Sequence, residues 1–284
     1  MSKEYIGVDL GGSSFNMGRV IKGMLVDEVK RDIDGKADEA AVLMELTSLL
    51  DKIITPDVQG IGIGVPGIVD PVPGIIYDIQ NIPAWKEVHL KEILENRYDV
   101  PVALNNDANC FALAEKMFGK GREYRNFVGV TIGTGLGMGV IINNQLYNGV
   151  MCGAGEIGML PYLDGIVEEY AASFFFTRNY SENARTVHEN ALKDQPQAIE
   201  AFHKFGHHLG EAIKMILFMF APEVVILGGS IAKAHKFFET SMKESIGQFA
   251  YPRQTEGLRI LISTHPNIAI LGASALVMDL TSSD

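Results

Sequence analysis

The second half of the chain repeats the sequence pattern of the first half. Three stretches recur in the same order: residues 5–25 match 127–146, 60–67 match 223–230, and 100–115 match 258–274. In the first match Gly129 corresponds to Gly7 and, after a slip of one residue, Gly139 corresponds to Gly18. This repeat is longer than the units of solenoid proteins, so the sequence predicts two similar α/β domains.

Each repeated stretch has the pattern of a buried strand that ends on glycine or polar residues. Ligands of open α/β sheets bind beyond the carboxyl ends of the strands. Two such domains therefore predict a substrate cleft between them. We expect an N-terminal domain over residues 1–107, completed by a C-terminal helix at about 268–284, and a C-terminal domain over residues 108–267. Periodicity also predicts helices over residues 39–54, 85–98 and 108–118.

A short glycine-rich turn follows the first strand of each half. The turns contain Gly11, Gly12, Ser13 and Ser14 in the first half and Gly133, Thr134 and Gly135 in the second. Glycine lets the backbone approach a ligand closely, and hydroxyl and N–H groups bind phosphate oxygens. One such turn is often only a turn, but two in matching context predict a pair of nucleotide-phosphate loops. Asp9 is placed to reach a metal ion on those phosphates, and Gly228 and Gly229 form a third junction suited to an adenosine.

The polar pair Asn106 and Asp107 falls between a predicted strand and a predicted helix. An aspartate at a helix N-terminus is a common cap, which is the structural alternative to a catalytic role. The corresponding place in the second half is His265, so the carboxylate occurs in one half only. A cap would serve both halves equally. In a kinase, such a carboxylate accepts the proton of the substrate hydroxyl and aligns that oxygen with the γ-phosphate.

Two glutamates of the second half are candidate sugar ligands, because carboxylates accept hydrogen bonds from hydroxyl groups. Glu156 is flanked by glycines and is expected on a loop. Glu168 opens an apparent helix, where a negative charge also favours the helix dipole. From the residues alone, surface charge is an equal explanation for Glu156 and the leading one for Glu168.

Seven motifs carry a family resemblance, in the order VDLGGSS, GVPGIVD, NIPAW, NNDANCFALAE, TIGTGLGMGVIINNQLYNG, GAGEIG and LGGSI. Over nearly its whole length the chain resembles the ROK family of repressors, open reading frames and sugar kinases. The resemblance implies two duplicated ribonuclease-H-like domains of the actin-like ATPase fold and an ATP- and Mg²⁺-dependent kinase acting on a hexose such as glucose, most simply at O6. It also implies a homodimer.

The same resemblance implies roles for individual residues. Asp107 corresponds to the catalytic base, and Asp9 with the glycine-rich turns corresponds to the site of ATP and Mg²⁺. The implied sugar contacts are Gly67, Asn81, Asn106, Asp107, Glu156 and Glu168. Kinases for N-acetylmannosamine, fructose, allose or a β-glucoside, and a non-catalytic sugar-sensing regulator, stay open as alternatives, as does polyphosphate as the phosphoryl donor.

Two positions depart from the family pattern. The histidine that usually follows the glycine of GEIG is Met159 here, and residues 160–170 contain none of the cysteines of the family zinc site. We therefore expect no structural zinc, and one sugar contact is left open. Repressors of the family carry a helix-turn-helix ahead of the first phosphate loop, whereas eight residues precede Asp9 here, so direct repression is not expected.

The charge and cysteine content restrict the partners. A net charge of −11 argues against a nucleic-acid surface, which needs a basic face. An acidic protein can still bind phosphate through backbone N–H groups and a divalent metal. Cys110 and Cys152 form no CxxC pair, and the first residues, MSKEY, contain no apolar run. We expect a cytoplasmic protein without a membrane segment.

Overall fold

The chain forms two compact units in a computed structural model that describes residues 3–11, 14–79 and 82–280. Unit 1 comprises Met1–Arg122, Leu146–Ala154 and His265–Asp284, and unit 2 comprises Glu123–Gln145 and Gly155–Thr264. Gly12, Ser13 and Asn81, which are predicted ligand contacts, lie outside the described residues. The domain limits expected from the sequence stay a prediction.

Unit 1 is built on a five-stranded sheet with the order β3-β2-β1-β4-β8. The strands are β1 (Glu4–Leu10), β2 (Ser14–Ile21), β3 (Met24–Asp32), β4 (Val58–Val65) and β8 (Val102–Asn106). The first three strands are antiparallel, and β4 runs parallel to both β1 and β8. A tight turn at Lys22 and Gly23, both with positive φ, joins β2 to β3.

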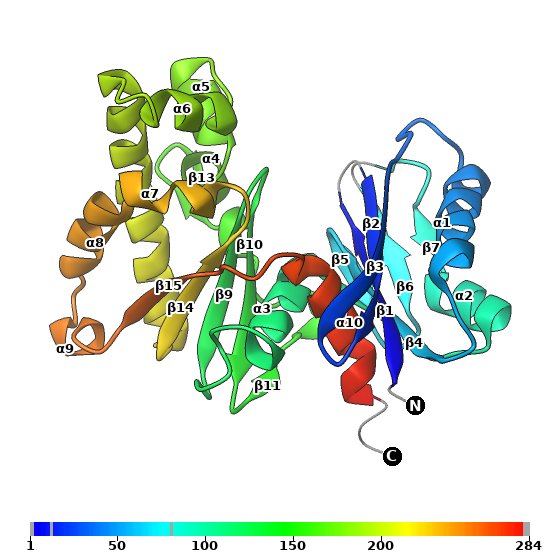
Figure 1. Ribbon diagram of the computed structural model, residues 1–284. Coiled ribbons are helices and arrows are strands. Elements are labelled where there is room, and N and C mark those ends of the chain that lie inside the picture. Colours follow the sequence, from blue (N-terminus) through cyan, green and yellow to red (C-terminus); the bar gives the residue numbers. More distant parts are fainter. Residues whose placement is uncertain (1–2, 12–13, 80–81, 281–284) are drawn as a thin grey trace. The chain divides into compact units, whose positions relative to one another are not determined.

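Helices cover both faces of this sheet (Figure 1). They are α1 (Glu39–Ile53), α2 (Leu90–Tyr98), α3 (Asp107–Met117) and α10 (Ile268–Leu280). The isoleucines of β4 join the core under α1 and α2, whereas its alternating glycines face α10 and α3. A Cβ on Gly62 would lie 1.8 Å from the carbonyl oxygen of Ala273 in α10. The alternation of glycine and isoleucine in β4 thus lets α10 rest directly on the strand backbone.

A small sheet of unit 1 corrects one sequence prediction. It comprises β5 (Ile68–Asp70), β6 (Ile75–Tyr77) and β7 (Glu87–Val88). The helix predicted over residues 85–98 begins only at Leu90, because β7 pairs with β6 and Trp85 is buried in the preceding turn. Pairing with a distant strand overrides the local helical periodicity there.

The second sheet has the order β11-β10-β9-β14-β15 and repeats the arrangement of the first. Its strands are β9 (Phe127–Ile132), β10 (Leu136–Ile142), β11 (Gln145–Leu146), β14 (Val224–Gly228) and β15 (Arg259–Ile262). Gly7 pairs with Gly18 in the first sheet and Gly129 with Gly139 in the second, as the internal duplication predicts. The one-residue slip lies in the turns, because four positions separate the paired ends of β1 and β2 and three separate those of β9 and β10.

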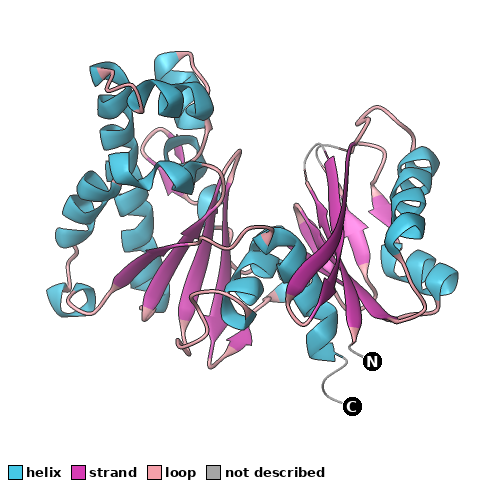
Figure 2. Cartoon of the chain, in the orientation of Figure 1, coloured by secondary structure: helices cyan, strands magenta, loops and turns pink. Residues whose placement is uncertain are grey.

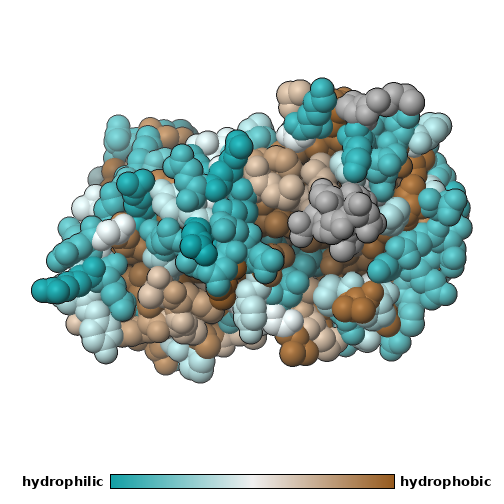
Figure 3. Space-filling view, turned by 90° about the horizontal axis from the view of Figure 1, so that it is seen from below, coloured by the Kyte–Doolittle hydropathy of each residue, from teal (hydrophilic) through white to brown (hydrophobic). Residues whose placement is uncertain are grey.

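Helices and short turns complete unit 2 (Figure 2). They are η2 (Ile157–Met159), α4 (Val167–Ala171), α5 (Phe174–Tyr180), α6 (Ala184–Ala191), α7 (Pro196–Phe220), η3 (Ile231–Phe237), α8 (Glu239–Gly247) and α9 (Pro252–Thr255), with the hairpin β12 (Pro161–Tyr162) and β13 (Gly165–Ile166). Buried phenylalanines of α5 and α7 pack on the sheet in one core. Figure 3 shows hydrophilic side chains over much of one face, with apolar side chains in smaller patches. Among the described residues, no helix has both the length and the apolar character needed to cross a membrane.

Candidate active site

A row of residues crosses the sheet of unit 1 at one level. The strand registers place Lys30 opposite Asn16, Asn16 opposite Asp9, Asp9 opposite Gly64, and Gly64 opposite Asn105. Directly opposed residues of neighbouring strands project from the same face of a sheet. The row therefore gathers polar side chains from β1, β2, β3 and β8 near the carboxyl ends of β1, β4 and β8.

Asp9 is the carboxylate of this row, and its environment favours the protonated form. Burial and, after it, the charge of Asp107 raise the pKa of Asp9 from 3.8 to about 6, with Lys30 acting in the opposite direction. Asp9 and Asp107 thus lie close enough to repel each other. A bound cation would relieve this repulsion and favour the ionised form of Asp9.

The residues around Asp9 fit a magnesium ion. The Oδ1 atom of Asn16 is buried and has no hydrogen-bond partner within the described part of the chain. Mg²⁺ is commonly bound by one or two protein oxygens together with phosphate oxygens and water. The oxygens of Asp9 and Asn16 match that donor set. Residues 3–11, 14–79 and 82–280 contain no group of three or more histidine, cysteine or acidic side chains arranged to hold a metal ion.

The start of α3 is capped by Asn106. Its Oδ1 accepts hydrogen bonds from the N–H groups of Ala108 (2.9 Å) and Asn109 (3.4 Å). Asp107 is the first residue of the helix, and its side chain is exposed. Asn106 is therefore the cap of this helix, and Oδ1 of Asp107 shares one of its donors, the N–H of Ala108 (2.8 Å).

A network of asparagine side chains, which sequence reasoning missed, supports this helix start. Asn105 Oδ1 accepts from the N–H of Asn106 (2.8 Å) and from Nδ2 of Asn109 (2.9 Å). Asn105 Nδ2 donates to Oδ1 of Asn148 (2.9 Å), and Asn106 Nδ2 donates to the carbonyl oxygen of Gly67 (3.3 Å). The network fixes the backbone that carries Asp107 and brings Gly67 beside Asn106. The NNDAN pattern indicated polarity at this strand end, but no sequence signal connects it to Asn148.

The segment that carries Asn148 has a strained backbone. Met151 and Cys152 adopt φ values of 51° and 57°, a left-handed conformation that is uncommon for residues other than glycine. Cys152 packs into the core of unit 1, and its thiol hydrogen-bonds the backbone of Asn106. Burial raises the pKa of this thiol to about 11. Strain of this kind persists where the surrounding contacts hold it, here next to Asn106 and Asp107.

Unit 2 places two of its predicted glycine-rich segments side by side. The turn at Gly133 and Gly135 is closed by a hydrogen bond from the N–H of Gly133 to the carbonyl oxygen of Gly135 (3.0 Å). The Oγ atom of Ser230 lies 3.8 Å from the place a Cβ of Gly133 would take, so the Gly228–Gly229 junction adjoins this turn. Gly229 has a φ of 86°, and a Cβ on it would lie 2.4 Å from the carbonyl oxygen of Ile132. In unit 1 the corresponding turn is closed by the N–H of Gly11 and the carbonyl oxygen of Ser14 (2.9 Å).

The two candidate sugar ligands of unit 2 also lie together. Burial, followed by the charge of Glu168, raises the pKa of Glu156 above its usual value. Glu168 has an additional contact, because its Oε2 accepts the N–H of Leu136 at 2.8 Å, directly after the glycine-rich turn. Unit 2 thus brings Glu156, Glu168 and the second phosphate turn into one neighbourhood.

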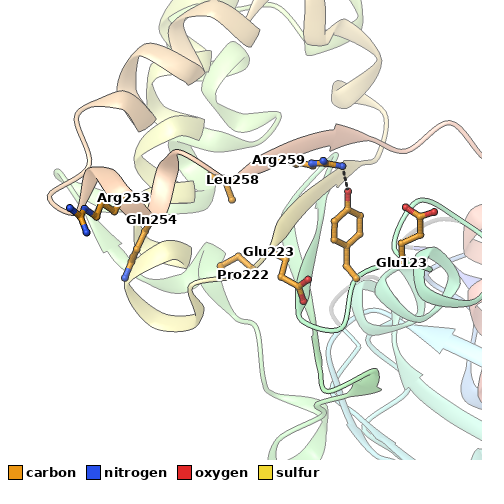
Figure 4. A pocket seen from close by; sticks show the side chains of 9 residues that line it. Glu123, Pro222, Glu223, Arg253, Gln254, Leu258 and Arg259 are labelled. Carbon is orange, nitrogen blue, oxygen red and sulfur yellow. Dashed lines mark hydrogen bonds between the residues drawn. The ribbon is translucent and has the colours of Figure 1, made fainter.

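A cavity of about 520 Å³ lies at the opposite end of the second sheet (Figure 4). It is lined by residues that precede β9, β14 and β15, at the amino ends of these strands. Arg259 donates to the hydroxyl of Tyr124, and Arg253 points away from it. Glu223 accepts the N–H groups of Arg125 and Asn126. These side chains do not converge on a common point, so the cavity does not compete with the site at the carboxyl ends.

Comparison with known proteins supports the resemblance. The sequence model of the ROK family matches residues 5–280. A glucokinase of Halalkalibacterium halodurans is 29% identical over 312 residues, covering 96% of this chain and 94% of that protein. A xylose repressor of Bacillus subtilis is 30% identical over 302 residues, covering 96% and 77%. The crystal structure of a ROK family glucokinase from Streptomyces griseus in complex with glucose and AMPPNP is similar with a TM-score of 0.83 and 23% identity, covering 99% and 100% of the two chains. The predicted actin-like α/β fold is thereby confirmed.

Proposed function

Because this chain belongs to the ROK family, we propose that it is an ATP-dependent sugar kinase that phosphorylates a hydroxyl of a hexose. Glucose is the first candidate acceptor and O6 the first candidate position. The glucokinase relative, similar along nearly the whole length of both chains, supports this choice. N-acetylmannosamine, fructose, allose and a β-glucoside are the next acceptors to test, and polyphosphate is the second donor to test.

The observation that carries the proposal is the placement of two carboxylates at one end of the first sheet. Asp107 is exposed at the start of α3 and is not the cap of that helix. Asp9 lies near enough for the charge of Asp107 to raise its pKa. A kinase needs one carboxylate to accept a proton and another oxygen ligand for the metal on the phosphates. In this scheme Asp107 is the base, and Asp9 and Asn16 supply the oxygen ligands of the metal ion.

Each residue has a defined task. Asp107 accepts the proton of the attacking hydroxyl, and Asn106, fixed by its amide network, orients the sugar beside it. Glu156 and Glu168 accept hydrogen bonds from other sugar hydroxyls, and Gly67 and Asn81 are proposed as further contacts. When bound, Mg²⁺ neutralises charge on the transferring phosphoryl group.

The glycine-rich turns bind the nucleotide in this proposal. Backbone N–H groups need no positive side chains to bind phosphate, which suits a chain of net charge −11. Gly11, Gly12, Ser13 and Ser14 form the first turn, Gly133, Thr134 and Gly135 the second, and Gly228 and Gly229 the adenosine junction. Precise positioning and fixed dipoles supply most of the rate in phosphoryl transfer.

A non-catalytic sugar-sensing regulator is the second candidate, because a xylose repressor is as similar to this chain as the glucokinase. Met159 bears on both candidates. It is 59% exposed and lies on the same short turn as Glu156, so an apolar thioether stands beside a proposed sugar ligand. A regulator would bind sugar without transferring phosphate.

The deciding experiment is a panel of sugars with ATP and Mg²⁺, assayed for sugar-dependent ADP release. We expect turnover with at least one hexose, and Asp107→Asn to lower kcat by a factor of about 10² to 10⁴ while sugar binding persists. Asp57→Asn is the control, since Asp57 is an exposed residue of the turn before β4. Sugar binding without any turnover would favour the regulator, and near-normal turnover of Asp107→Asn would remove Asp107 as the base.

A further inference from the structure

In the second glycine-rich turn, Gly133 to Gly135, the carbonyl groups and the N–H groups differ in their hydrogen bonding. A phosphate loop binds its ligand through N–H groups, so its carbonyl oxygens must point elsewhere to avoid repelling the phosphate. All three carbonyl oxygens of the turn are occupied within unit 2. Those of Gly133 and Thr134 accept hydrogen bonds from Ser173, and that of Gly135 accepts the N–H of Gly133 (3.0 Å).

The N–H groups of the same turn are differently placed. Within the described part of the chain, those of Thr134 and Gly135 have no hydrogen-bond partner. Thr134 is also exposed. The turn therefore offers two adjacent donors to a ligand while its acceptors are engaged by the protein.

Ser173 supplies two of the bonds that produce this polarity. Its N–H donates to the carbonyl oxygen of Gly133 and its Oγ donates to that of Thr134, both at 3.0 Å. One residue thus holds two successive carbonyl groups, which requires an N–H and a hydroxyl on the same residue. Serine and threonine meet this requirement, and alanine does not.

The position of Ser173 is itself fixed. It lies between α4 and α5, with the fully buried Ala172 before it and the buried Phe175 shortly after it. On the preceding helix, Glu168 accepts the N–H of Leu136 at 2.8 Å where the turn passes into β10. The segment from Glu168 to Ser173 therefore holds the turn at its beginning and at its end.

We propose that Ser173 is a positioning residue for the nucleotide: it turns the carbonyl groups of Gly133 and Thr134 inward and so presents the N–H groups of Thr134 and Gly135 to a phosphate. This inference rests on the proposed function, which makes the turn a phosphate loop. No motif predicted it, because Ser173 is 38 residues beyond Gly135 in the sequence.

Two substitutions and a matched control test the proposal. Ser173→Ala removes only the bond to Thr134, and Ser173→Thr retains a hydroxyl. Thr177→Ala is the control, because the Thr177 hydroxyl also donates to a backbone carbonyl, that of Phe174 (3.1 Å), one turn further along α5. Binding of a non-hydrolysable ATP analogue with Mg²⁺ and, separately, of the sugar identified by the panel is measured by calorimetry.

We expect Ser173→Ala to weaken nucleotide binding about 3- to 10-fold, as the loss of one hydrogen bond predicts. Ser173→Thr should bind within about twofold of the wild type, and sugar binding should be unchanged in every variant. Equal nucleotide affinity of Ser173→Ala and wild type would overturn the proposal, as would an equal loss in Thr177→Ala.

Amide hydrogen exchange of residues 133–136 in the ligand-free protein separates this inference from the proposed function. Faster exchange at the Leu136 amide in Ser173→Ala than in Thr177→Ala supports the positioning role, and equal exchange overturns it. If the wild-type protein binds no nucleotide, the proposed function fails. The role of Ser173 in positioning a nucleotide is then overturned as well, even where the exchange result shows that Ser173 orders the turn.

Discussion

Replacing Gly62 by alanine should strongly destabilise unit 1. The added Cβ would lie 1.8 Å from the carbonyl oxygen of Ala273 and 2.7 Å from its carbon, both backbone atoms of α10. A flexible side chain cannot move aside to accommodate it, so α10 must shift away from β4 by more than 1 Å. Overpacking of this kind typically costs about 1–3 kcal/mol. We expect the upper end, about 3 kcal/mol, because glycines also let α10 approach β1 and α3 closely. A Cβ on Gly7 would lie 2.0 Å from the carbonyl oxygen of Ile270, and one on Gly272 would lie 2.1 Å from that of Cys110.

Urea unfolding measures this effect as the change in the free energy of unfolding. Gly247→Ala is the matched control, since no atom lies within 4 Å of the position its Cβ would take. The control should be neutral or slightly stabilising, because alanine reduces the freedom of the unfolded chain. A Gly62→Ala protein within about 0.5 kcal/mol of the wild type would refute the close approach of α10 to β4.

Three further predictions concern the amide network, the metal side and pH. Asn148→Leu leaves the nearly buried Asn105 amide without an acceptor and should lower the free energy of unfolding in urea by about 1–3 kcal/mol. Asn148→Asp keeps an acceptor oxygen and should lower it less. Equal losses of stability in the two variants would contradict the role of that oxygen. Asp9→Asn should weaken binding of the Mg²⁺ complex of an ATP analogue at least about tenfold without weakening binding of the metal-free analogue. A similar loss of affinity with and without Mg²⁺ would show that Asp9 does not bind the metal ion. Burial, and then the charge of His207, lowers the pKa of His208 to about 4, below its usual 6.5. The unfolded chain therefore takes up this proton first, so the stability that the neutral His208 contributes above pH 6.5 should be lost as pH falls from 6.5 to 4. His208→Gln should lessen this decline, and an unchanged pH dependence of the urea midpoint would exclude His208 as its source.

The duplication was readable from the sequence because it depends on local patterns. The glycines of β1, β2, β9 and β10 repeat at nearly constant spacing, and the structure pairs them in equivalent registers. The glycine alternation of β4 was also visible, although its reason, the approach of α10, was not. A backbone contact between residues more than 200 positions apart leaves no mark except the missing side chain.

The supporting residues of the candidate site could not be predicted in the same way. Asn148 and Ser173 act through hydrogen bonds to residues distant in the sequence. Asn148 lies near the end of a family motif that does not indicate its partner, and Ser173 lies in a stretch without a motif. The predicted start of α2 was wrong for a similar reason, because Glu87 and Val88 pair with β6 in a small sheet. Local patterns thus identified the turns and strand ends, while the contacts that orient them depend on the assembled units.

Unit 1 is built from three separate segments of the chain, which affects how it folds during synthesis on the ribosome. The sheet formed by the earliest residues is covered on one face by α10, which is translated about 260 residues later. Until then, the surface of β4 at Gly60 and Gly62 lacks the helix that covers it in the native structure. Maturation of this half must therefore wait for the end of synthesis, and a nascent chain arrested after Thr264 should be protease-sensitive in its first hundred residues.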